Sequence, residues 1–399
     1  MNPDLWRTHP TLALLSWLPV PLGTLAVLLP LWPPFARRFA RPAAGWAFFV
    51  LTRVVLGAIV FGAFQHRSWD WQGYIQIGQA ALAGLTPYRD FATLYAPGLP
   101  YLLALGVLLS PTFGPLVLFV AADLGAWLAL GRLSNGLAPR RDSAAWAYLA
   151  FPPVWYFETR YAQEEAIAAL FLALALVALA RGRGARAGAA LAVGQLVTKI
   201  LFGLCALPIL LARGARRSTW LVYAGPVALV YGAMTLMRIP WTREALVQAG
   251  AFGTGPTLWR LPALWWGFDL GRMAMLPFII LFVSGGWRLI RRGADAVAHA
   301  AWLWGCFALL APKLLPMYVV MVAPALALWV ARGGGGRLVW WALYGFAMAT
   351  AWYADSGPVQ GLLGPAWVAP AAAALALVAA LDLWLLMRVA KDEAVAVGP

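Results

Sequence analysis

The sequence predicts an all-α, polytopic membrane protein that forms one transmembrane domain over residues 1–399. Three observations predict this fold class: hydrophobic residues make up 63% of the chain, charged residues only 11%, and the mean hydropathy is +0.75. A soluble domain averages about 45–50% apolar and about 25% charged residues. The apolar residues recur in continuous Leu- and Ala-rich blocks of about 17–24, each long enough to cross about 30 Å of hydrocarbon as a helix.

The order of the spans follows from the distribution of arginine. Seven basic clusters separate the apolar blocks, and the positive-inside rule places them in the cytoplasm; they begin at Arg37, Arg132, Arg181, Arg213, Arg288, Arg332 and Arg388. We therefore expect about 11 spanning helices, near 11–32, 43–64, 113–133, 144–157, 162–180, 219–237, 273–289, 295–311, 314–331, 338–354 and 365–388. The prolines of the first block also suit a re-entrant segment, so its orientation stays open.

One interval between basic clusters is too short for two spans. Only 26 residues lie between Arg186 and Arg213, whereas two full spans need about 40. We therefore expect a short helical hairpin over 187–212, with arms near 187–198 and 201–212 and Lys199 at its tip. A cation at that depth is tolerated beside a water-filled cavity or an anion.

Two segments are expected to lie on the outer side of the membrane, 65–111 and 238–272. The first contains two candidate interfacial helices, near 74–83 and 99–109. Asp70 falls where a span ends, among aromatic side chains that suit the membrane interface. From position alone, Asp70 marks either the point where a helix meets water or a functional carboxylate.

The first outer segment also carries two short motifs. Gly84-Leu85-Thr86-Pro87-Tyr88 is followed by Tyr95-Ala96-Pro97-Gly98, and a buried Lys199 occurs later in the chain. This order resembles the GT-C superfamily of integral membrane glycosyltransferases, and most closely the polyprenyl-phosphate-mannose-type mannosyltransferases and the aminoarabinose and protein O-mannosyl transferases. The matching segments, Ser68–Pro100, Tyr161–Leu211 and more faintly Ala311–Trp329, cover roughly a third of the chain.

The resemblance implies an activity and assigns one catalytic residue. Asp70 is the implied general base, and the reaction is transfer of a sugar from a polyprenyl-phosphate donor to an acceptor hydroxyl, with inversion. The acceptor is a glycan, a lipid or a protein.

The Asp-x-Asp motif of some members is absent here, since Asp70 is followed by Trp71 and Gln72, so we expect no bound metal and no cofactor. The implied location is the inner or plasma membrane, with the active site on the extracytoplasmic side. A Gly-Gln pair of the mannosyltransferase branch appears here as Ala162-Gln163.

The candidate substrate-binding residues are polar or aromatic side chains expected near the outer face or at the hairpin tip. They are Lys199, Tyr88, Arg89, Tyr95, Glu158, Arg160, Glu165, Lys313 and Tyr318. We expect Lys199 to bind the donor phosphate, since an intramembrane cation is a functional candidate.

Several of these candidates have a simpler interpretation. Glu158, Arg160, Glu164 and Glu165 cluster at a span end and also suit a solvated turn with Arg160 paired locally. Snorkelling explains Lys313. Arg89 also suits a turn after Pro87. Arg53, within the span 43–64, is either a ligand for a lipid phosphate or the partner of a buried carboxylate such as that of Asp123.

Three other functions compete with transfer. A net charge of +15 would suggest nucleic acid in a soluble protein, but the arginines lie between apolar blocks and not among stacking aromatics, so we expect no such partner. A transporter or flippase of lipid-linked sugars needs a similar cavity, although transporters commonly show two similar halves and no clear repeat occurs here. A non-catalytic subunit of an envelope-assembly complex is the third alternative.

Overall fold

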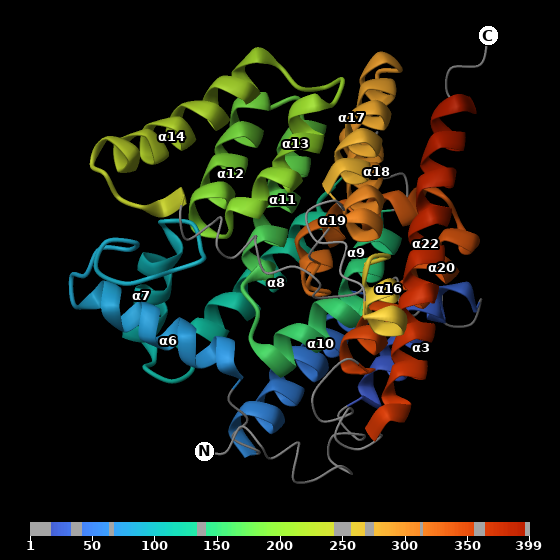
Figure 1. Cartoon of the computed structure of the whole chain (residues 1–399), viewed down its shortest axis with the longest axis horizontal. Helices are drawn as coiled ribbons and strands as arrows, with labels where there is room; N and C mark the ends of the chain where they lie inside the picture. The colour runs from blue at the N-terminus through green and yellow to red at the C-terminus, as the bar shows by residue number, and fades with distance from the viewer. Residues whose placement is uncertain are drawn as a thin grey trace.

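The fold is described from a computed structural model (Figure 1). The structure describes residues 17–32, 42–63, 68–133, 141–242, 257–267, 275–311, 314–354 and 364–395. Within these ranges the regular structure is helical and no β-strand occurs; one isolated bridge joins Pro87 and Phe91. The helices are α3 Pro19–Leu28, η1 Leu29–Leu31, α5 Pro42–Phe49, η2 Val50–Val55, η3 Ala58–Ala63, α6 Trp69–Leu82, α7 Leu99–Leu109, α8 Gly114–Gly131, α9 Arg141–Ala150, α10 Pro152–Tyr161, α11 Glu165–Ala180, α12 Gly184–Val197, η4 Ile200–Phe202, α13 Gly203–Leu211, α14 Arg217–Leu236, α16 Arg260–Trp266, α17 Met275–Arg291, α18 Ala296–Leu310, α19 Tyr318–Arg332, α20 Gly335–Ala354, η6 Gly364–Trp367 and α22 Val368–Val395.

The all-α membrane fold predicted from composition is confirmed. Among the described residues, four helices are long and apolar enough to cross a membrane: Pro42–Gly62, Gly114–Gly131, Arg217–Leu236 and Gly364–Asp392. Six shorter apolar helices accompany them, including α11, α18 and α19, whose residues are mostly buried. By contrast, α14 buries only Thr219 and Met234 of its 20 residues. A helix so apolar and so little covered by protein needs lipid around it.

The expected span 144–157 is wrong as a single helix. The chain forms α9 and α10 instead, with a break at Phe151, whose backbone is extended (φ −61°, ψ 117°). The cause is local: Pro152 and Pro153 follow, and a proline disfavours helical dihedral angles in the residue before it. α10 then continues to Tyr161, past the expected end of the span, and this extension places its C-terminus beside α6.

In the segment expected on the outer side, residues 68–111 contain the two expected helices, α6 and α7, which pack against each other. α6 begins earlier than expected, at Trp69, because the hydroxyl of Ser68 caps it by accepting a hydrogen bond of 3.1 Å from the backbone N–H of Trp71. Asp70 therefore lies in the first turn of a helix, where the backbone holds its side chain in a defined direction.

The short hairpin is also confirmed. α12 ends at Val197, Lys199 has an extended backbone (φ −125°, ψ 153°), and η4 leads directly into α13. In Figure 1 the two arms stand beside α11, against which both pack. Lys199 lies at the tip, between the arms.

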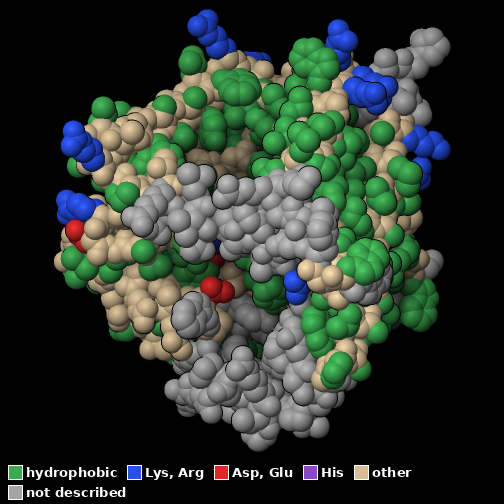
Figure 2. All heavy atoms as spheres, in the orientation of Figure 1, with side chains coloured by type: hydrophobic (Ala, Val, Ile, Leu, Met, Phe, Trp, Pro, Cys, Tyr) green, Lys and Arg blue, Asp and Glu red, His purple; other side chains and the backbone are tan. Residues whose placement is uncertain are grey.

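Several basic side chains lie along one edge of the molecule, and others lie away from it (Figure 2). Figure 2 shows Lys and Arg over one end of α14, α17 and α22, where Arg217, Arg288, Arg291, Arg388 and Lys391 occur. This distribution is the one expected of a cytoplasmic face.

The topology gives a first prediction. We expect Asp70 and Gly255 to face outward, and Arg140, Arg213, Gly334 and the C-terminus to face the cytoplasm; Arg140 and Gly255 lie outside the described residues. Single-cysteine variants at residues 140, 255 and 334, treated with an impermeant thiol reagent, would measure it. The native Cys205 and Cys306 are both buried, so their background labelling should be low. Labelling of residue 334 in intact cells would contradict this topology.

Candidate active site

A short turn between α10 and α11 organises the candidate site. α10 ends at Tyr161; the next residue, Ala162, has a left-handed backbone (φ 54°, ψ 68°), and α11 begins at Glu165. The next three side chains are all polar and all buried: Gln163 is 4% exposed, Glu164 1% and Glu165 1%. Buried polar groups require partners, and each of these side chains has one from another part of the chain.

Asp70 is the partner of Gln163. The side-chain amide of Gln163 donates a hydrogen bond of 2.8 Å to Oδ2 of Asp70, and Oδ1 has no hydrogen-bond partner among the described residues. Burial raises the pKa of the Asp70 carboxyl above its ordinary value of 3.8; the hydrogen bond from Gln163 opposes this shift, the charge of Glu164 adds to it and that of Lys199 opposes it. A partly buried carboxylate with one free oxygen has the properties of a general base.

Lys199 is the partner of both glutamates. Its Nζ lies 2.5 Å from a carboxylate oxygen of Glu164 and 2.6 Å from one of Glu165. It also lies over two aromatic rings, 4.9 Å from the centroid of Tyr318 and 5.7 Å from that of Tyr95. The Lys199 side chain is 17% exposed. An ammonium has three donors, so the two carboxylates leave one for another acceptor.

Tyr74 connects the helix of Asp70 to this ion-pair cluster. Its hydroxyl donates a hydrogen bond to Glu164 Oε2, and its ring lies 5.5 Å from that of Tyr95. Asp70 and Tyr74 are four residues apart on α6 and therefore share one face of the helix. α6 thus presents both side chains to the turn at residues 162–165.

Backbone hydrogen bonds join the Tyr-x-Pro-Gly motif, residues 95–98, to the hairpin tip. The backbone N–H of Ala96 donates to Thr198 O at 2.9 Å, and that of Gly98 donates to Leu196 O at 2.7 Å. A Cβ at Gly98 would lie 2.6 Å from Leu196 O, so only glycine allows this approach. The hydroxyl of Tyr88 donates to the carbonyl of Tyr95, and burial raises the pKa of Tyr88. Tyr88 therefore supports the loop that places Tyr95 beside Lys199.

One predicted site residue, Arg89, lies away from this turn. Arg89 has a side chain 60% exposed and pairs with Asp90 at 2.9 Å. Asp90 also accepts a hydrogen bond of 2.7 Å from the backbone N–H of Thr86, and the Arg89 and Thr86 contacts lower the pKa of Asp90 to about 2. This is a surface turn. Lys313 and the side chain of Arg160 lie outside the described residues.

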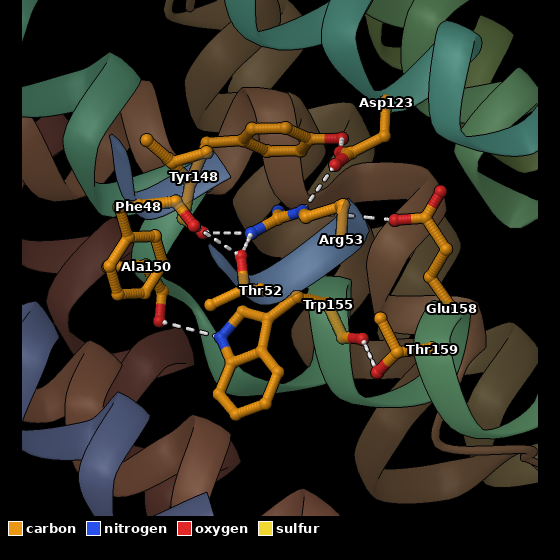
Figure 3. A network of polar contacts seen from close by, with 10 residues as sticks. Phe48, Thr52, Arg53, Asp123, Tyr148, Ala150, Trp155, Glu158 and Thr159 are labelled. Atoms are coloured by element: carbon orange, nitrogen blue, oxygen red, sulfur yellow. Dashed lines mark hydrogen bonds and ion pairs between the residues drawn. The ribbon is translucent and has the colours of Figure 1, made fainter. Parts of the chain in front are cut away.

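Glu158 belongs to a second, buried network (Figure 3). Arg53 Nε lies 2.7 Å from Asp123 Oδ2 and 3.8 Å from Glu158 Oε2, and the hydroxyl of Tyr148 donates to Asp123 Oδ1 at 2.6 Å. Arg53 also donates to Leu149 O at 2.9 Å. Arg53 is therefore the partner of a buried carboxylate, one of the two roles that the sequence left open, and the network ties η2 to α8, α9 and α10.

Sequence reasoning placed Asp70, Lys199, Tyr95, Glu165 and Tyr318 among the candidates, and the structure gathers these residues around one turn. It also weighed Glu164, with Glu158, Arg160 and Glu165, but it missed Gln163 and Tyr74 as members of the site. The available signal was the run of three polar residues between two apolar helices. In the described part of the chain, no group of three or more His, Cys, Asp or Glu side chains is arranged to hold a metal ion.

Comparisons with known proteins were made by family, by sequence and by structure. No family model and no curated protein matches this chain. Among solved structures, ArnT from Cupriavidus metallidurans, bound to undecaprenyl phosphate, is similar over 87% of this chain and 79% of its own, with 16% sequence identity and a TM-score of 0.40. A likeness of this degree says nothing about the reaction of this chain.

Proposed function

We propose that this protein is a membrane-embedded glycosyltransferase of the GT-C type. It transfers a sugar from a polyprenyl-phosphate donor to an acceptor hydroxyl at the outer face of the membrane, with Asp70 as general base. The observation that carries the proposal is that a carboxylate, Asp70, and an ammonium, Lys199, both contact the turn at residues 163–165, Asp70 through Gln163 and Lys199 through the two glutamates.

The base would act through the free oxygen of Asp70. As the acceptor oxygen attacks the anomeric carbon, its proton passes to Oδ1, while the bond from the anomeric carbon to the donor phosphate breaks. The electron pair leaves with the phosphate, so no general acid is required. The attack comes from the side opposite the leaving phosphate, and the configuration is inverted. A carboxyl with a raised pKa is the stronger base for this step.

Lys199 would bind the departing phosphate. Two carboxylates and two tyrosine rings hold its ammonium in place, and the third donor would face the phosphate, where a charge-assisted hydrogen bond strengthens as charge develops. The proposed donor class, a sugar linked to a polyprenyl phosphate, is the one that the motif resemblance implies.

The proposal is tested by an assay in detergent micelles, where no compartments exist. Purified protein is given a synthetic undecaprenyl-phosphate sugar and a panel of acceptors: a lipid-linked glycan, a polysaccharide, a glycolipid and a peptide. We expect transfer that depends on one class of acceptor. A transporter would give no transfer in micelles but would move labelled donor across a proteoliposome membrane, and a non-catalytic subunit would do neither. Either of these results would refute the proposal.

A further inference from the structure

Gln163 is the one side chain that forms a hydrogen bond with Asp70 in the described part of the chain. Building on the proposed function, we infer that Gln163 is a positioning residue for the base: its amide holds Oδ2 of Asp70 and leaves Oδ1 directed to the acceptor hydroxyl. Gln163 itself would not touch substrate. It would act through Asp70.

The backbone explains why Gln163 reaches Asp70. The N–H of Ala162 donates to Glu158 O at 2.9 Å and closes the last turn of α10, and the left-handed conformation of Ala162 then turns the chain away from the helix axis. An alanine in this conformation is uncommon, so the surrounding packing maintains it. The side chain of Gln163 extends from the turn to α6, which packs against α10. This side chain is 4% exposed.

A neutral amide is well suited to this role because of the charges nearby. The charged groups that act on Asp70 are Glu164 and Lys199, with opposite effects on its pKa. Gln163 adds no charge to this balance, but its N–H stabilises the carboxylate form, since a hydrogen bond to the charged form favours it. Gln163 thereby limits how far burial raises the pKa of Asp70.

The experiment uses four variants of the full-length protein in nanodiscs. Gln163→Met keeps the size of the side chain and removes the donor, and Gln163→Glu places a second acid beside Asp70. Gln195→Met is the matched control: Gln195 is also 4% exposed, but its amide donates to the backbone carbonyls of Ile200 and, at 3.5 Å, of Lys199, and accepts from Tyr223, so it forms no hydrogen bond with Asp70. Two quantities are measured: the acid limb of the pH–rate profile with the synthetic donor, and the titration of Asp70 by carboxyl-carbon NMR of aspartate-labelled protein. Asp70→Asn assigns the NMR signal.

We expect the Asp70 midpoint to rise by about one pH unit in Gln163→Met and further in Gln163→Glu, and to stay in place in Gln195→Met. The kcat of Gln163→Met should fall without a change in the KM for the donor. A loss of stability alone lowers the amount of active protein and does not move a midpoint. Coincident midpoints in the parent and Gln163→Met would overturn the inference. The proposed function fails separately, if Asp70→Asn keeps the parental rate.

Discussion

Replacing Lys199 by methionine is expected to lower the free energy of unfolding by roughly 3–5 kcal/mol. The sequence alone favours an effect on donor binding far greater than on folding, but the structure changes this expectation. Lys199 forms ion pairs of 2.5 and 2.6 Å with Glu164 and Glu165, which are each 1% exposed. Without the ammonium, two buried carboxylates are left uncompensated. The measurement is a denaturant titration of the purified protein.

A triple variant separates charge from packing. Lys199→Met combined with Glu164→Gln and Glu165→Gln removes the cation together with both anions, so most of the lost stability should return, while binding of a polyprenyl phosphate should stay weak. If the triple variant is no more stable than Lys199→Met, the loss comes from the lysine stem between Tyr95 and Tyr318. Parental stability of Lys199→Met would show that the ion pairs do not form.

The hairpin could be predicted because it follows from chain length alone. The 26 residues between Arg186 and Arg213 are too few for two spans, and basic residues flank them on both sides. Because both ends are expected on the same side of the bilayer, the segment must form a short hairpin that does not cross it. The prediction needs no knowledge of what Lys199 contacts. The place of a cation was thus predictable from counting residues.

The partners of Lys199 could not be predicted in the same way. Whether two successive side chains, Glu164 and Glu165, reach one ammonium depends on the backbone of the turn that begins at Ala162, with its φ of 54°. Alanine carries no sequence signal for a left-handed conformation, unlike glycine. The role of Gln163 was hidden for the same reason.

The break at Phe151, by contrast, had a signal in the sequence. Pro152 and Pro153 argue against a helix through residue 151, but the apolar run around them suggests one continuous span. The helix break follows from the effect of proline on the residue before it, and the average hydropathy of the run did not predict it. The break also affects the site, because α10 begins as a separate helix at Pro152 and the turn that follows it contacts Asp70 through Gln163.

The variant Asp70→Asn is expected to lower turnover by at least about 10²-fold, the lower end of what a positioned general base contributes. The asparagine keeps the size of the side chain, and its oxygen can still accept the hydrogen bond from Gln163. The variant should therefore insert, fold and bind donor nearly as the parent does. In the parent, activity should fall with decreasing pH through a pKa above 3.8, since burial raises the pKa of Asp70 and only the deprotonated carboxylate is a base.

Two other carboxylates serve as controls for Asp70→Asn, assayed with the same synthetic donor and acceptors. Asp90→Asn should cost much less, because Asp90 lies in a surface turn, paired with Arg89. Glu165→Gln leaves Lys199 paired with Glu164. This variant should therefore change the affinity for the donor more than it changes the pH dependence of the rate. If Asp70→Asn keeps parental rates and Glu165→Gln is inactive, the base is the wrong carboxylate. If none of the three variants alters any activity of the protein, the glycosyltransferase proposal is wrong, and a transporter or a non-catalytic subunit becomes the better hypothesis.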